Sequence, residues 1–211
     1  MQVDVKEYLA KYIIQSKQTD NMDRLQLPDT CLDSEHIKVI MINEVTPQDP
    51  SDFFYSTAEQ PDYMKTTLSL FRNAGADVNN IQDIINKGIY ITTAVKCPKS
   101  SYSVDSDVIK SHNFILEEEL KLYPNLRVIM LMGDVAKKAF NMIAKKNTKK
   151  NVIPSESTYK IRKNEYFYGD IRVFPSYIMT GGNILIEKSK VAMVTDDIKQ
   201  MLEIIRVINS K

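Results

Sequence analysis

The arrangement of apolar and polar positions along the chain predicts four short strands. Residues 37–42 are apolar and mostly β-branched with almost no alternation, as expected of a strand that is covered on both faces. Three further apolar segments are predicted to form strands, at 88–98, 127–132 and 170–175. The first two strands run into polar residues, so a sheet built from them carries polar side chains at one edge.

Helices are predicted between these strands from apolar residues at helical spacing. Residues 4–15 are expected to form an amphipathic helix that lies over the domain. Asp134 and Thr195 stand where the N-caps of two later helices are expected, and Val108 is assigned to the buried stripe of a long helix. Residues 157–167 are assigned to a small hairpin. The other helices are expected at 63–73, 80–87, 105–123 and 135–146 and after Thr195.

Strands that alternate with helices indicate right-handed parallel crossovers. We therefore predict one α/β domain over residues 1–211, a three-layer αβα sandwich with a central four-stranded, mainly parallel sheet. Residues 1–28 are expected to supply a helix and a connector that pack on this domain. Parallel strands place their carboxyl ends at one edge, where ligands bind in open α/β sheets. The segments expected to meet there are EVTPQDPSDFF, TTAVKCPK, GD and YIMTGGN.

Composition narrows the class of protein. Of the 211 residues, 43% are hydrophobic and 26% are charged, which is typical of a globular chain. A formal net charge of +1 gives no global electrostatic argument for a nucleic-acid or membrane partner. No segment approaches the roughly 20 apolar residues of a membrane span, and the N-terminus has acidic residues where a signal peptide has basic ones. Cys31 and Cys97 are too far apart for a disulfide framework or a zinc ribbon, so we expect a cytoplasmic protein.

Glu44 is the first candidate for chemistry, because it follows a buried strand at the predicted ligand edge. A solvated carboxylate at the end of a strand is the equal alternative. Asp49 lies in a turn, where it can either act on a ligand or make an Asx turn. Phe53 and Phe54 are adjacent and point opposite ways if the segment is extended, so one is expected in the core and the other in a pocket.

Several segments resemble the uracil-DNA glycosylase superfamily, most closely its small bacterial members related to the iron-sulfur branch. They are GIYITTAVKCPK, FILEEELKLYPNLRVIMLMGDVAKKAF, LSLFRNAG and NEVTPQDPSDFFY, and the resemblance covers roughly residues 37–205. This sequence departs from the family at two motifs. The base-reading Asn falls on Thr93, and the motif that holds the catalytic His falls on Ile178, Met179 and Thr180. Only Cys97 matches one of the four cysteine ligands of a cluster, so we expect no cofactor and no metal.

The resemblance implies that a base leaves the DNA stack and enters a pocket. Phe53 or Phe54 would then stack on the base, while Glu44 or Asp49 would orient a water or stabilise the sugar. Lys96 and Lys99 are placed to contact a nucleic-acid backbone, and a solvated loop is the equal alternative. The other residues implied to bind the substrate are Thr93, Thr180, Gly181 and Asn183.

Two functional hypotheses remain from the sequence. The first is an enzyme that excises a deaminated or damaged base from DNA, either single-stranded or with a flipped base, by hydrolysis of the N-glycosidic bond. The second is a non-catalytic protein that binds a nucleobase or nucleotide and has lost the catalytic His and the base-reading Asn. A monomer without a membrane partner is expected in both cases.

Overall fold

The computed structural model describes residues 1–17, 24–181, 184 and 187–210. Its main feature is a five-stranded sheet with the order β4-β3-β5-β7-β6. The first four of these strands are parallel, and β6 pairs with β7 in the antiparallel direction. Their bounds are β3 Val39–Thr46, β4 Ile89–Pro98, β5 Val128–Met132, β6 Tyr166–Tyr168 and β7 Ile171–Ser176. The sheet therefore has one strand more than the four predicted.

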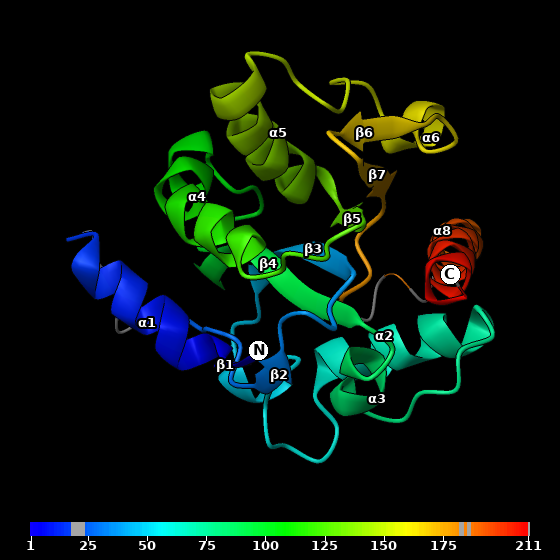
Figure 1. Ribbon diagram of the computed structural model, residues 1–211, viewed down its shortest axis with the longest axis horizontal. Helices are drawn as coiled ribbons and strands as arrows, with labels where there is room; N and C mark the ends of the chain where they lie inside the picture. Colours follow the sequence, from blue (N-terminus) through cyan, green and yellow to red (C-terminus); the bar gives the residue numbers. More distant parts are fainter. Residues whose placement is uncertain (18–23, 182–183, 185–186, 211) are drawn as a thin grey trace.

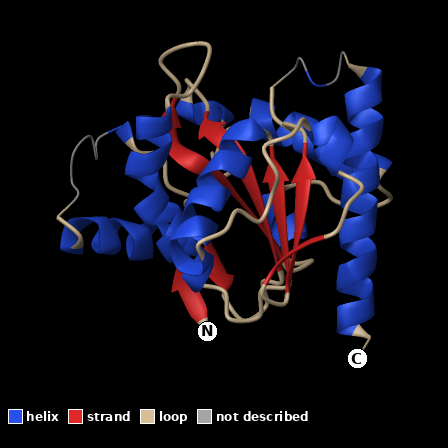
Figure 2. Cartoon of the chain, turned by 90° about the horizontal axis from the view of Figure 1, so that it is seen from above, coloured by secondary structure: helices blue, strands red, loops and turns tan. Residues whose placement is uncertain are grey.

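Helices cover both faces of this sheet (Figure 1). Two of them, α4 and α5, pack against each other and against β3, β4 and β5. On the opposite face α2 packs against α8, which also contacts β7. The bounds of these helices are α2 Asp62–Asn73, α4 Ser106–Lys121, α5 Asp134–Thr148 and α8 Lys188–Asn209, with the short α3, Ile81–Ile85, beside β4. The chain thus has the predicted α/β class, with helices on both sides of a mostly parallel sheet (Figure 2).

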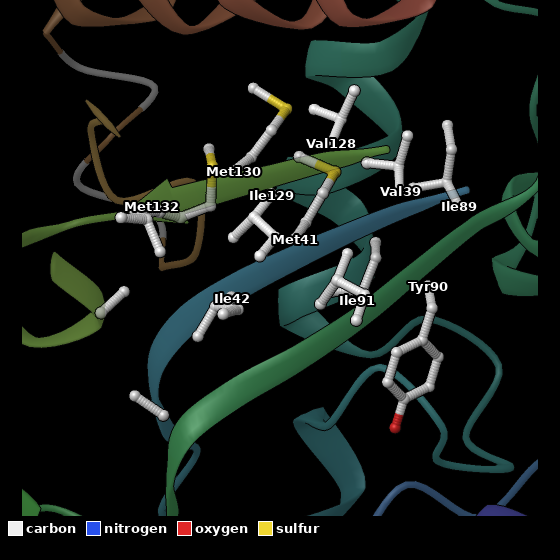
Figure 3. Close-up of a cluster of buried hydrophobic side chains, with 14 of the residues drawn as sticks. Val39, Met41, Ile42, Ile89, Tyr90, Ile91, Val128, Ile129, Met130 and Met132 are labelled. Carbon is white, nitrogen blue, oxygen red and sulfur yellow. The ribbon is translucent and has the colours of Figure 1, made fainter. Parts of the chain in front are cut away.

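The core follows from the continuous apolar character of the strands. All residues of β3 from Val39 to Asn43 are buried, as expected of a strand that is covered on both faces. Figure 3 shows apolar side chains of three adjacent strands gathered in one cluster. They include Val39, Met41 and Ile42 of β3, Ile89, Tyr90 and Ile91 of β4, and Val128, Ile129, Met130 and Met132 of β5.

The N-terminal helix is confirmed as α1, Val5–Gln15. Asp4 caps it by accepting the N–H of Glu7, and the buried residues Val5, Leu9 and Ile13 form one face at helical spacing. A small antiparallel sheet at this end was not predicted. It pairs β1, Gln2–Asp4, with β2, Cys31–Asp33, and its three-residue strands are too short to give a sequence signal.

Two predicted elements are wrong around the fourth strand. Residues 157–167 do not form a hairpin, because they contain the short helix α6, Thr158–Ile161. The hairpin lies later in the chain, where β6 and β7 meet at a two-residue turn that contains Gly169 at a φ of 58°. Thr195 does not cap a helix either, since α8 begins at Lys188 and Thr195 is buried within it.

Two further assignments shift by one residue. Gly133, not Asp134, occupies the N-cap position of α5, and Asp134 is the first residue of the helix. In α4 the buried stripe contains Ile109, Ile115 and Leu116, whereas Val108 is exposed. An imperfect apolar stripe in the sequence is enough to predict that a helix forms. It does not predict equally well which face of the helix is buried.

The outer edge of β4 is bonded by groups from three different parts of the chain. The Tyr55 hydroxyl donates to the carbonyl of Ile91 at 2.6 Å, and the N–H of Gln26 donates to the carbonyl of Lys96 at 2.7 Å. The N–H of Lys96 donates to Nδ1 of His112 at 3.2 Å. None of these groups belongs to a neighbouring strand, so β4 ends the sheet on this side.

Candidate functional site

A pocket of about 610 Å³ opens where the carboxyl ends of β3, β5 and β7 meet. This is the edge at which parallel α/β sheets bind ligands. Its lining combines carboxylates, two lysines, three tyrosines and several hydroxyl groups. The residues that carry them include Glu44, Tyr63, Lys99, Asp134, Ser157, Thr158, Tyr159, Ser176, Tyr177, Thr180, Glu187 and Lys190. We refer to it as the strand-edge pocket.

Glu44 is held in this pocket by the start of α5. It lies within β3 rather than after it, since the strand runs on to Thr46. Its Oε1 accepts the N–H of Val135 at 3.0 Å, in the first turn of the helix, where backbone N–H groups lack partners within the helix. Burial raises the pKa of the Glu44 carboxyl, although the N–H groups of Val135 and Asp134 oppose this by stabilising the ionised form. Glu44 is therefore a carboxylate with increased basicity at the wall of a pocket.

Gly133 makes this approach possible, and sequence reasoning did not identify it as a site residue. Its φ of 109° belongs to the region that favours glycine. A Cβ atom at this position would lie 2.4 Å from Oε1 of Glu44 and 2.7 Å from Cγ1 of Ile178. The only sequence signal is the lack of a spare residue between the end of β5 and the start of α5.

Three tyrosines contribute to the lining without having been predicted. The Tyr63 hydroxyl donates to the carbonyl of Val45 at 3.3 Å, and burial raises the pKa of Tyr63 to about 12, so it is a neutral hydroxyl at pH 7. The ring of Tyr177 lies 5.8 Å from Nζ of Lys190. Tyr159 is 73% exposed, which leaves its ring accessible at the pocket. Tyr63 and Tyr159 lie on the helices α2 and α6, and no local pattern in the sequence places helical residues at the strand edge.

Four of the predicted site residues line this pocket: Glu44, Lys99, Thr180 and Gly181. Asn183 lies outside the described residues. The other predicted residues lie elsewhere, and each has a physical reason for its position.

Asp49 is exposed and takes the alternative role of an Asx turn. Its carboxylate accepts the N–H of Ser51 at 2.9 Å and caps the short helix η2, Pro50–Asp52. Phe53 and Phe54 are both buried in the core, and the Phe54 ring packs against Tyr63 at a centroid distance of 5.2 Å. The prediction that one of them is presented to a ligand is therefore wrong, and Phe54 instead supports a residue of the wall.

The positions of Lys96 and Thr93 also differ from those predicted. Lys96 is fully buried, and its Nζ lies 2.5 Å from Oε2 of Glu119 and 2.6 Å from Oγ1 of Thr92, so it is not available to a phosphate. Thr93 is buried on β4 next to Asn43 of β3 and does not line the pocket. Both corrections arise because β4 is covered on both faces as far as Lys96.

The His, Cys, Asp and Glu side chains in the described part of the chain bear on metal binding. In it, no group of three or more His, Cys, Asp or Glu side chains is arranged to hold a metal ion. An iron-sulfur cluster does not fit, because Cys31 lies exposed on β2 beside Asp4, while Cys97 lies near the end of β4 and contacts His112. No helix within the described ranges is both long and apolar enough to cross a membrane.

Comparisons with known proteins do not assign the chain to a family. No protein-family model matches it, and no match is found among the curated proteins. The arrangement of the strand-edge pocket is therefore the main basis for a functional proposal.

Proposed function

We propose that the strand-edge pocket binds a nucleobase of DNA and that Glu44 promotes hydrolysis of its N-glycosidic bond. The observation that carries this proposal is the half-buried Glu44 carboxylate, bonded to the N-terminus of α5, at the wall of a pocket of about 610 Å³. That volume is typical of sites for small organic ligands. The resemblance of β4, α4 and β5 to the uracil-DNA glycosylase superfamily supports the choice of a nucleobase.

Hydrolysis of the N-glycosidic bond requires a group that stabilises the positive charge developing on the sugar. When the bond between C1′ and the base breaks, the base leaves with the electron pair and the sugar becomes cationic. An ionised Glu44 would stabilise this cation and then accept a proton from the water that attacks C1′. Because burial raises its pKa, Glu44 is a stronger base than an exposed carboxylate, while the Val135 N–H favours the ionised form.

A second candidate function is binding of a nucleobase without chemistry. It is favoured by the small number of catalytic groups in the pocket. Two of the lining carboxylates form ion pairs, Asp134 with Lys137 and Glu187 with Lys190. Glu44 is therefore the one carboxylate among the described lining residues that has no ion pair. The described lining contains no histidine that could donate a proton to the leaving base.

Base release from uracil- and hypoxanthine-containing oligonucleotides tests the proposal. We expect the wild type to release base and Glu44→Gln to do so about 10²–10⁴ times more slowly, because Gln cannot accept the proton. Glu203→Gln, an exposed residue of α8, is the matched control and should retain the wild-type rate.

Two results would reject hydrolysis by Glu44. One is an equal rate for wild type and Glu44→Gln, and the other is no release above buffer. If no base is released, calorimetry with free bases tests the second candidate function. Binding that Glu44→Gln weakens supports this function, and a lack of binding rejects it as well.

A further inference from the structure

A second pocket of about 530 Å³ lies beside the loop that follows β4. Its walls come from that loop, from the first half of α4, and from residues on either side of positions 18–23. The residues that line it include Lys17, Arg24, Leu25, Cys97, Lys99, Ser100, Ser101, Ser103, Asp105, Val108, Ser111 and His112. We refer to it as the serine-loop pocket. Lys99 lines both this pocket and the strand-edge pocket.

Positive charge dominates the described lining of the serine-loop pocket. Lys17, Arg24 and Lys99 line it, and no carboxylate within the described ranges forms an ion pair with any of them. Asp105 is the one carboxylate in the described lining. Among the described lining residues, three cations and one carboxylate leave an excess of two positive charges.

The start of α4 brings free N–H groups to this pocket, alongside the carboxylates of Asp105 and of Asp107 in the first turn of the helix. Asp105 occupies the N-cap position, but its side chain makes no capping hydrogen bond. The first N–H groups of a helix have no partners within the helix and carry the positive end of its dipole. Because α4 runs from Ser106 to Lys121 and both Asp105 and Val108 line the pocket, its first turn faces the same cavity as the three cations.

His112 and Cys97 are side by side in the pocket, but they are not a catalytic pair. Nδ1 of His112 accepts the N–H of Lys96 at 3.2 Å, so the neutral ring carries its proton on Nε2, which lies 3.4 Å from Sγ of Cys97. Burial lowers the pKa of His112 to about 4, and burial raises the pKa of the Cys97 thiol. A thiolate stabilised by a charged imidazole is therefore absent at pH 7 from this part of the structure, and the pocket is suited to binding rather than to covalent chemistry.

We propose that the serine-loop pocket binds a small ligand through a phosphate monoester. A phosphate monoester carries about −1.5 to −2 charges at pH 7, which is opposite in sign to the excess of positive charge among the described lining residues. Arg24 and the two lysines provide charge-assisted hydrogen bonds, and the start of α4 provides free N–H groups. The proposal does not depend on the function of the strand-edge pocket.

Cys97 gives a direct readout, because it lines the pocket while Cys31 is exposed on β2. The rates at which iodoacetamide alkylates the two thiols can be measured on the full chain by peptide mass spectrometry. Inorganic phosphate and glycerol 3-phosphate are the probes, and sodium chloride at equal ionic strength is the reference. We expect saturable protection of Cys97, reaching about tenfold when the probe is at ten times its Kd, with no change at Cys31.

Charge variants test which residues bind the probe. Arg24→Gln is expected to raise the probe concentration needed for half protection by about tenfold, the usual loss for one charge-assisted bond. Lys11→Gln, which removes the same charge from an exposed position on α1, should leave it unchanged. The alkylation rate of each variant without probe controls for changes in the exposure of Cys97.

Three outcomes overturn the proposal. They are no protection by either phosphate, protection by chloride alone to the same extent, and equal sensitivity of the Arg24 and Lys11 variants. An oligothymidylate without terminal phosphates is a further arm. If it protects Cys97 while inorganic phosphate and glycerol 3-phosphate do not, the pocket binds the phosphodiester backbone of a nucleic acid, and the proposal of a small phosphorylated ligand is wrong.

Discussion

The buried pair of Lys96 and Glu119 leads to a prediction that can be worked out in detail. Both side chains are fully buried, with Nζ 2.5 Å from Oε2. Oε1 of Glu119 accepts the hydroxyls of Tyr90 at 2.5 Å and Thr92 at 2.8 Å. Replacing Lys96 by Met keeps a side chain of similar shape and removes the ammonium group, which leaves a buried carboxylate without a cation.

We expect Lys96→Met to lower the free energy of unfolding by about 3–5 kcal/mol, the usual cost of removing one partner of a buried ion pair. This is a large part of the roughly 5–15 kcal/mol that stabilises an ordinary domain. Glu119→Gln is expected to cost a similar amount, because it leaves the ammonium group unpaired. The double variant Lys96→Met/Glu119→Gln should lie within about 1–2 kcal/mol of wild type. No charge remains in it, and the Gln oxygen still accepts from Tyr90 and Thr92.

The pH dependence of stability gives a second, independent test of the buried pair. Burial lowers the pKa of Lys96, and Glu119 opposes this, so removal of the carboxylate lowers the pKa further. A base whose pKa is lower in the native state than in the unfolded chain stabilises the native state at high pH, and this stability is lost as the pH falls. The deficit of Glu119→Gln relative to wild type should therefore shrink between about pH 7 and about pH 9.5.

Urea titrations followed by circular dichroism measure these values, and the chain has no tryptophan for a fluorescence assay. The reasoning fails if Lys96→Met costs less than about 1 kcal/mol, which would place it among ordinary surface pairs. It also fails if the double variant loses the sum of the two single losses, because independent sites add and coupled ones do not.

Three further predictions concern the pockets. Gly133→Ala should lower the free energy of unfolding by about 1–3 kcal/mol more than Gly75→Ala does. Both glycines have a positive φ, but only a Cβ atom at position 133 would lie against Glu44. Equal losses for the two variants would show that this contact is unimportant. Glu44→Gln should be more stable than wild type at pH 7 and lose this advantage in urea titrations below pH 4.5. Burial raises the pKa of Glu44 above 4.5, so the native state is favoured most at low pH and this stability is lost as the pH rises; an advantage that grew on acidification would contradict it. The ring resonances of His112 in NMR spectra should not titrate between pH 8 and about pH 5.5, because burial lowers its pKa to about 4; a midpoint near pH 6.5 would refute the proposed neutral ring.

The elements that the sequence predicts well are those with a long local pattern. The strands β3, β4, β5 and β7 and the helix α2 repeat apolar residues over enough positions to be identified. The strand β6 has only three residues and is defined by its partner, which no local window contains. The extra strand was therefore missed for a physical reason, since strand pairing is a tertiary interaction.

The candidate site could be predicted only where local structure decides the position of a side chain. Glu44 was found because it belongs to the end of a strand, and its location at the edge follows from the parallel sheet. Lys96 was misassigned because its partner Glu119 lies 23 residues away on another element, so a lysine near a strand end looked exposed. Phe53 and Phe54 differ from pocket residues only in what packs over them, and the sequence does not encode that locally.

The outer edge of β4 also bears on solubility. A strand of ten residues at the edge of a sheet normally offers free N–H and carbonyl groups to the same strand of another molecule. Here Tyr55, His112 and Gln26 bond to three of those groups, and none of the three residues belongs to a strand of the sheet. The loop, the connector and the helix α4 that supply these bonds thus protect the chain against edge-to-edge aggregation, in addition to stabilising its fold.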